Sequence, residues 1–430
     1  MFKTLRNAWA IPDLRKKMIF TILMLIVYRF GSMIPVPGLD AEMMKAFMAA
    51  DGGMGLFSLL DTFSGGALSN ATIFAMGISP YINSSIIIQL LTVAIPALER
   101  LSKQGEEGRK KINSITRYAT IILALLQAVG LYFTLKSYQV VSDPGVMSAI
   151  VIMLTFTAGT AFVMWIGEEI TDKGIGNGIS LIIFAGIISR LPSAVVTLYN
   201  QFLADISVMN VIMLVLIVAM FIAVLGFVVF MNNAERRIPI QYAKRVVGRK
   251  MYGGQSTNIP IKVAMAGVMP IIFASSICMF PATIMQFFGG GQNMTGFWKA
   301  VYDQITTTGW VYAIVYFVLI IFFTYFYTAM QYNPIEMANN IKKNGGFIPG
   351  IRPGKPTSDF ISKTLNRVVL VGALFLGLIA VLPIFLSHIN QLSGIAMGGT
   401  SLLIVEGVAL ETVKQIESQM MMRHYKGFLE

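Results

Sequence analysis

Very few residues of this 430-residue chain are of the types that carry out catalysis or hold metals. Cys278 is its one cysteine, and His388 and His424 are its two histidines. This set excludes an internal disulfide, an HExxH motif and a multi-histidine zinc site. The sequence also lacks a G-x-x-x-x-G-K-[ST] motif, so work driven by nucleotide hydrolysis must come from a partner. We therefore expect no catalytic residues, no metal and no cofactor.

The composition is that of a membrane protein. The chain is 55% hydrophobic and 13% charged, with a mean hydropathy of +0.70. At about 20 residues per helical span, its length allows roughly ten spans. The apolar runs are continuous rather than alternating, which favours helices over a transmembrane β-barrel. The predicted spans are 18–35, 72–98, 118–138, 150–168, 178–198, 208–231, 263–288, 310–330, 368–388 and 396–414.

Lysine and arginine residues are concentrated on one side of these spans. If the N-terminus, alternate loops and the C-terminus are cytoplasmic, those segments hold 28 of the 33 basic residues. The other five are Arg29, Lys45, Lys136, Arg190 and Lys299. This asymmetry follows the positive-inside rule and places both termini in the cytoplasm. The net charge of +12 therefore mostly reflects the orientation of the spans in the membrane, and it does not require a nucleic-acid ligand.

Two cytoplasmic loops, 232–262 and 331–367, are longer than a helix connection requires. Their basic side chains could dock an acidic or phosphate-rich partner. The alternative is that they are basic only because they are cytoplasmic. This alternative is weaker for Arg352, because Pro349-Gly350 and Pro353-Gly354 bracket it and would hold it at a defined turn. The candidate docking residues are Arg236, Arg237, Lys244, Arg245, Arg249, Lys250, Arg352 and Lys355.

The outer segment 56–71 is apolar but too short to cross a bilayer, and Gly65-Gly66 interrupts it. We expect a short helix within or capping the outer side of the protein. Such a segment at membrane depth requires surrounding protein or a water-filled cavity, which suggests a central cavity. The alternative is a surface helix packed on the outer face.

An internal repeat divides the chain in two. Gly77-Ile78-Ser79-Pro80 and Gly267-Val268-Met269-Pro270 are each followed by a Ser-Ser-Ile sequence, in the second and seventh predicted spans. Because each half then has five spans, the two halves, 1–200 and 201–430, would have opposite orientations in the membrane. Chance similarity between apolar segments is the alternative.

Few ionisable residues lie inside the predicted spans, chiefly Arg29 and Glu406. This scarcity argues against a transporter that couples to protons or ions.

Long blocks of the sequence resemble the SecY family, the pore subunits of the Sec protein translocase, and especially its Bacillus-type members. They include RFGSMIPVPG (29–38), FSGGALSNATIFAMGISPYINSSIIIQLL (63–91), GEEITDKGIGNGIS (167–180), AGVMPIIFASSICMFPATI (266–284), NPIEMANNIKKNGGFIPGIRPG (333–354) and GGTSLLIV (398–405). The resemblance covers essentially the whole chain, in order. It implies ten transmembrane helices in two inverted halves around an hourglass pore in the bacterial plasma membrane, with a lateral gate between spans 2 and 3 and spans 7 and 8.

The resemblance also implies roles for individual residues. An apolar ring closing the pore would comprise Ile78, Ile82, Ile179, Ile183, Ile272 and Ile404. A plug at about 57–71 would lie beneath the ring and include Phe57, Leu60, Phe63, Gly65, Gly66 and Leu68. For any one isoleucine considered alone, ordinary packing or lipid contact is the alternative.

The implied partners are the membrane subunits SecE and SecG, the SecA ATPase, the ribosome, secretory and membrane polypeptides with signal sequences, and the lipid bilayer. Glu406 departs from the family pattern, which is apolar at that position. It lies about 200° around a helix from Ile404, so we expect it to face neighbouring helices or a partner, protonated or paired.

The leading hypothesis is a protein-conducting channel and not an enzyme. A secondary transporter is the alternative, and an intramembrane enzyme is a more distant one.

Overall fold

The structure, a computed structural model, describes residues 2–50, 56–202, 208–242, 245–247, 250–252, 256–287, 309–387 and 398–426. It is dominated by helices, and every predicted span contains one. Those helices are α2 (Pro12–Gly31), α5 (Ser79–Ala94), α7 (Glu106–Ser137), α8 (Val146–Lys173), α9 (Gly178–Ser189), α11 (Val208–Asn233), α12 (Met269–Phe287), α14 (Trp310–Gln331), α16 (Lys355–Ser387) and α17 (Gly398–Lys426).

Five helices in the described ranges are long and apolar enough to cross a bilayer by themselves, and a sixth span is possible if the bent pair α5 and α6 counts as one. The remaining predicted spans are shorter or carry more charge. The chain is therefore an all-helical membrane protein in its spanning region. Short helices connect these elements: α1 (Phe2–Ala10), α3 (Ala41–Ala50), α4 (Leu56–Ser64), α6 (Pro96–Ser102), α10 (Leu191–Phe202) and α15 (Pro334–Lys343).

Several predicted boundaries were wrong, and proline and glycine account for the clearest cases. The second span was predicted from residue 72, but its helix begins at Ser79, after Gly77 with φ +54°. It then bends by 104° between α5 and α6, where Pro96 begins the second helix. Proline has no backbone N–H to continue the helical ladder, which explains this break.

The loop 232–262 contains β-strands that the sequence analysis did not predict. β1 (Glu235–Tyr242) pairs antiparallel with β4 (Ser256–Lys262) and with β5 (Gly346–Phe347), and β2 (Arg245–Val247) pairs with β3 (Lys250–Tyr252). β1 buries Ile238 and Ile240 on one face, with the exposed Pro239 between them. This alternation is the signature of a half-buried strand.

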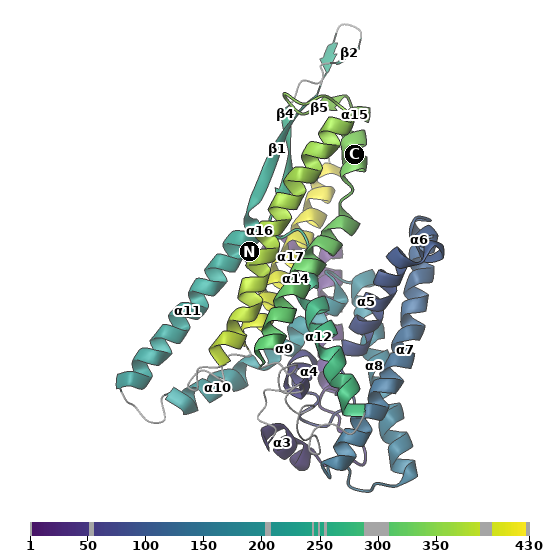
Figure 1. Cartoon of the computed structure of the whole chain (residues 1–430), viewed down its shortest axis with the longest axis vertical. Coiled ribbons are helices and arrows are strands. Elements are labelled where there is room, and N and C mark those ends of the chain that lie inside the picture. Colours follow the sequence, from purple (N-terminus) through teal and green to yellow (C-terminus); the bar gives the residue numbers. More distant parts are fainter. Residues whose placement is uncertain are drawn as a thin grey trace.

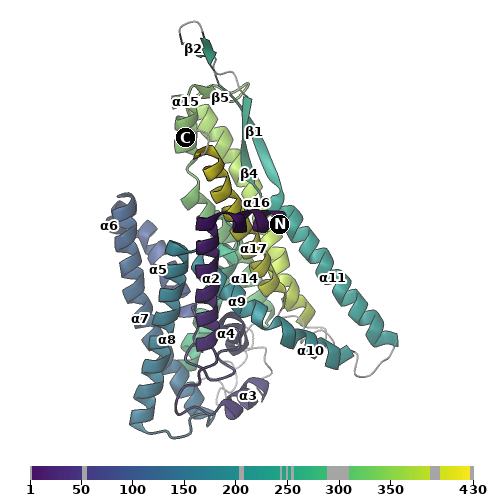
Figure 2. The same cartoon turned by 180° about the vertical axis from the view of Figure 1, so that it is seen from behind.

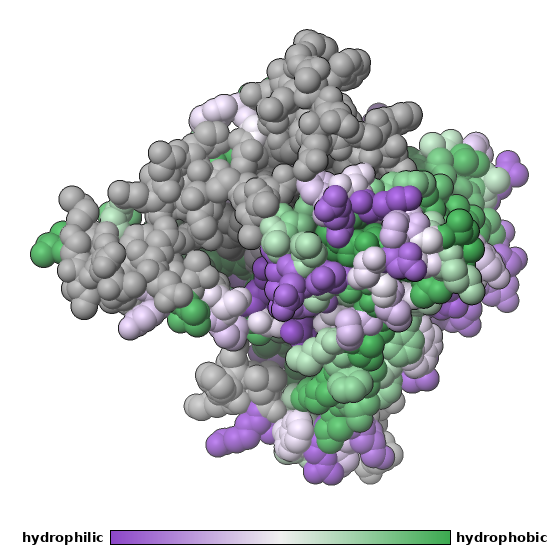
Figure 3. Space-filling view, turned by 90° about the horizontal axis from the view of Figure 1, so that it is seen from below, coloured by the Kyte–Doolittle hydropathy of each residue, from purple (hydrophilic) through white to green (hydrophobic). Residues whose placement is uncertain are grey.

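Figures 1 and 2 show an elongated bundle with these strands and the C-terminus toward one end, the N-terminus about midway along it, and α3 and α4 toward the other end. Viewed from that second end, hydrophilic residues gather near the middle of the described surface, with hydrophobic residues beside them (Figure 3). α11 slants away from the other helices in both cartoons. Only 11% of its most apolar window is buried, against 33–56% for the other four long spans.

Candidate functional site

The six isoleucines predicted for the ring share one buried cluster. Five of them are at most 6% exposed, and Ile179 is partly buried against the same cluster. They come from helices far apart in sequence: α5, α9, α12 and α17. The structure therefore brings together residues from both halves of the chain into a continuous apolar contact.

Four of these residues, Ile78, Ile82, Ile179 and Ile272, lie at the N-cap or in the first turn of their helices. Ile78 is the N-cap residue of α5, and Ile272 is in the first turn of α12. At the start of α9, the Asn177 side chain accepts hydrogen bonds from the backbone N–H groups of Ile179 and Ser180. Such a cap fixes where a helix begins. Local signals therefore fix the helix starts at which Ile78 and Ile179 lie.

The repeated Gly-x-x-Pro motifs produce the same local structure twice. Gly77 and Gly267 have φ angles of +54° and +59°, and in each case the helix begins two residues later. Glycine adopts such angles without the penalty of a Cβ atom. α5 and α12 are also in contact with each other. The two halves therefore use the same turn to end an irregular segment and start a helix beside the cluster.

The predicted plug is a short helix, α4, followed by an irregular segment. Phe63 belongs to the cluster that contains the ring isoleucines, and Leu60 packs against it. Phe57 and Leu68 belong to a second buried cluster formed with α3, α7 and α8. Gly65 and Gly66 both have positive φ angles and turn the chain after α4. The segment is thus packed inside the protein, which is the first of the two alternatives left open by its sequence.

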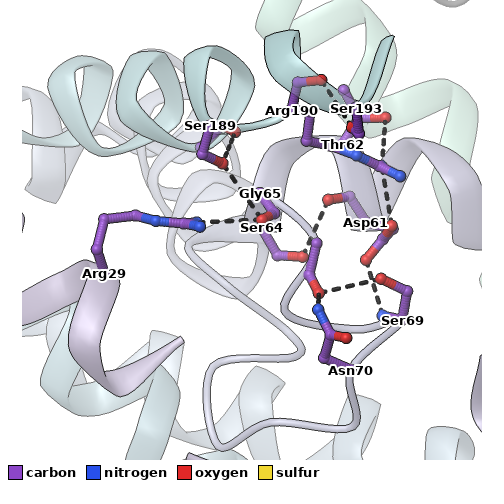
Figure 4. A network of polar contacts seen from close by, with 12 residues as sticks. Arg29, Asp61, Thr62, Ser64, Gly65, Ser69, Asn70, Ser189, Arg190 and Ser193 are labelled. Carbon is purple, nitrogen blue, oxygen red and sulfur yellow. Dashed lines mark hydrogen bonds and ion pairs between the residues drawn. The ribbon is translucent and has the colours of Figure 1, made fainter. Parts of the chain in front are cut away.

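Polar contacts also join this segment to the helices on either side (Figure 4). Arg29 of α2 donates a hydrogen bond from Nη1 to the Gly65 carbonyl oxygen at 3.1 Å. From the other side, Arg190 Nη1 lies 2.8 Å from Asp61 Oδ2. Asp61 and Arg190 were not among the predicted site residues. An acid within an apolar segment and a basic residue on the outer side were the signals that could have identified them.

The two basic loops, predicted to be cytoplasmic, pack together. Ile238, Ile240 and Ile261 of the first loop share a buried cluster with Ile341 and Ile348 of the second. Arg236 and Arg237 are exposed on β1, and Arg237 is paired with Glu235. Lys244 and Arg249 lie outside the described residues, while Arg245 and Lys250 lie on β2 and β3.

Arg352 is exposed between Gly350 and Gly354, whose φ angles are +81° and +108°. Its carbonyl oxygen accepts a hydrogen bond from the Thr357 hydroxyl at 2.9 Å, and Lys355 begins α16 with its side chain exposed. The predicted turn is therefore present.

Glu406 is buried in α17, at 8% exposure. Among the described residues neither oxygen of its carboxyl group has a hydrogen bond of good geometry, although the Asn232 side chain of α11 interacts with it. Glu406 thus faces a neighbouring helix, as expected.

Comparison with known proteins decides the family. The family model SecY matches residues 72–413. The chain belongs to the SecY family. Over the full length of both chains, it is 48% identical to protein translocase subunit SecY of Bacillus subtilis and 47% identical to that of Streptomyces galbus.

Solved structures of SecY-like channels have the same fold. A structure described as a protein conducting channel matches with a TM-score of 0.62 and 17% identity, covering 95% of this chain and 93% of that one. Sec61 in the canine ribosome-channel complex matches with a TM-score of 0.59 and 17% identity, covering 95% and 93%. The predicted SecY-family fold is thus confirmed.

Proposed function

We propose that this chain is the protein-conducting channel subunit of a bacterial Sec translocon. It would pass unfolded secretory polypeptides across the membrane and release apolar segments sideways into lipid. The observation that carries the proposal is the buried cluster of isoleucines from both halves of the chain, with the plug segment packed against it. This arrangement suits a barrier that must close against ions and still part for a polypeptide.

The ring residues would form that barrier. Branched aliphatic side chains make an apolar constriction that excludes water and ions by dewetting. They offer no polar group that would bind one substrate in preference to another. Because these side chains can also move aside when a polypeptide passes, they could close around polypeptides of any sequence. Ile78, Ile82, Ile179, Ile183, Ile272 and Ile404 are the residues to which we assign this role.

The plug and the lateral gate would control opening. Phe63 and Leu60 of the plug contact the isoleucine cluster, so displacing the plug would remove a layer of apolar packing from it. α5 and α12 come from different halves and contact each other without any connecting loop. Their separation would open a path between the pore and the lipid. Small side chains such as those of Ser84 in α5 and Ser276 in α12, which are both buried, allow close packing of these helices against their neighbours.

The exposed basic residues of the cytoplasmic loops would dock the partners. Acidic surfaces of a SecA-type ATPase and the RNA of a ribosome both suit Arg and Lys side chains. Arg352 is the residue we expect to matter most, because its turn is fixed by Gly350 and Gly354. SecE and SecG would accompany the chain in the membrane, and the sparsely buried α11 leaves apolar surface for such helices. The chain would lie in the plasma membrane with both termini in the cytoplasm.

Reconstitution tests the proposal. Vesicles containing the chain with SecE should import a secretory precursor when SecA and ATP are supplied, and protease protection of the precursor would measure the import. The same precursor without its signal sequence is the control. A chain that moves a small solute in exchange for protons, and imports no precursor under these conditions, would instead be a secondary transporter.

A further inference from the structure

Asp61 is a carboxylate placed almost entirely inside the protein. It belongs to α4, the helical part of the plug segment, and is 1% exposed. Its Oδ1 accepts a hydrogen bond from the Ser69 backbone N–H at 2.8 Å. Its Oδ2 lies 2.8 Å from Arg190 Nη1, in an ion pair whose geometry differs from that of a hydrogen bond (Figure 4). A carboxylate buried to this degree depends strongly on its cationic partner.

The ion pair joins two elements that are distant in sequence. Asp61 is on the plug helix, and Arg190 is the C-cap residue of α9, a helix that supplies two ring isoleucines. Next to the pair, the Ser189 hydroxyl lies 3.4 Å from the Gly65 carbonyl oxygen, and Arg29 reaches the same oxygen from α2. The plug is therefore held between two arginines that belong to different helices.

The positions of Arg29 and Arg190 are unusual for this chain. They are two of only five basic residues outside the predicted cytoplasmic segments. The positive-inside rule disfavours basic residues there, so a local role explains them better than topology does. In both cases the described hydrogen bonds and ion pairs of the side chain are with the plug segment.

We propose that Asp61 and Arg190 form a latch that holds the plug against α9 and thereby sets how readily the channel opens. The two are positioning residues, and the role rests on the function proposed above. Arg190 is 38% exposed, so it can take up water when the pair separates, while Asp61 leaves the interior with the plug. The latch can thus be broken without leaving an unpaired charge in the protein, which a reversible contact requires.

Thiol labelling tests the latch without requiring transport. Cys278→Ala removes the one native cysteine, and Ser64→Cys then places a thiol of similar size at a buried plug position. In this background, Asp61→Asn keeps an acceptor for the Ser69 N–H and removes only the charge. We expect it to raise the rate of modification by a membrane-impermeant maleimide at least about tenfold, as loss of one charge-assisted contact implies.

Three further variants identify the pair as the cause. Arg190→Gln should accelerate labelling to a similar degree, and the Asp61→Asn, Arg190→Gln double variant should label no faster than the faster single variant. Arg190→Lys should retain most of the protection. Asp143→Asn, which removes an exposed acid from the loop after α7, is the matched control and should label like the parent.

Ionic strength gives an independent readout. About 1 M KCl should accelerate labelling of the parent only modestly, because salt screens the pair through the partly exposed Arg190 but hardly reaches the buried Asp61, and should have less effect still on Asp61→Asn. Labelling of Asp61→Asn at the parent rate would overturn the latch, even if the chain imports precursor normally. Faster labelling in a chain that imports no precursor would support the latch and contradict the proposed function.

Discussion

Gly65 of the plug segment lies directly against Gly186 of α9. A methyl group on Gly65 would be 2.7 Å from the Gly186 Cα atom, and one on Gly186 would be 2.8 Å from the Phe63 carbonyl oxygen. Both distances are shorter than van der Waals contact, so the backbones meet with no room for a side chain. The two glycines therefore bring the plug to the helix that carries Ile179 and Ile183.

Gly186→Ala should loosen the plug, because its new methyl group meets backbone atoms that cannot rotate away. Overpacking of this kind costs about 1–3 kcal/mol. We expect a severalfold higher ion leak through vesicles that contain the variant and no precursor. Gly226→Ala is the control, since a methyl group at Gly226 of α11 would meet no atom within 4 Å. Equal leaks from the two variants would show that the contact does not hold the plug.

Polar substitutions at Ile78 and Ile404 should weaken the barrier. Asparagine at either position would place a hydrated amide in the constriction, which would favour its wetting. We expect a severalfold increase in ion leak and import of precursors with defective signal sequences. Ile87→Asn changes an isoleucine of α5 that is 37% exposed, and it serves as the control. Unchanged leak and unchanged selectivity in the ring variants would refute the ring assignment.

Charge reversal at Arg352 should impair docking of the proposed SecA-type ATPase. The fixed turn presents an exposed guanidinium on the loop predicted to be cytoplasmic, so a glutamate there would repel an acidic partner. We expect ATP-driven import to fall by at least about tenfold, the effect of 1.4 kcal/mol at such a contact. Lys110→Glu makes the same charge change at an exposed position near the start of α7 and should have a smaller effect. Normal import by Arg352→Glu would mean that the positive charge at position 352 reflects only the topology of the chain in the membrane and does not bind a partner.

Glu406→Gln should stabilise the chain when it is purified alone. A carboxylate inside the membrane costs about 2.5–3.5 kcal/mol on insertion scales, and its oxygens have no well-formed hydrogen bond among the described residues. We expect the unfolding temperature in detergent to rise by about 1–3 °C. A thiol-reactive dye would follow the transition, because Cys278 is the sole cysteine and is buried.

Glu411→Gln changes an exposed acid of the same helix and should leave the unfolding temperature unchanged. A lower unfolding temperature for Glu406→Gln would show that the carboxylate is already paired in the isolated chain.

The helical spans could be predicted from sequence because hydrocarbon imposes a strong local requirement. Each span must be apolar over about 20 residues and satisfy its own backbone hydrogen bonds. Their ends were predicted less well, since turns such as that at Gly77 lie within continuous apolar sequence. The strands β1 and β4 were missed for a related reason. Their pairing joins Glu235 to Lys262 across the loop, and a pattern within one segment does not reveal such a contact.

The sequence by itself determined the membrane class and, through resemblance, the family, while the sidedness of the charges and the ring residues stay predictions. Only the tertiary structure decided how the plug is held. Asp61 and Arg190 are 129 positions apart, and Gly65 and Gly186 are 121 apart. Neither pair has a local pattern that links its members. Ion pairs and close backbone contacts depend on positions fixed to within an ångström, and these positions arise only when the helices have packed.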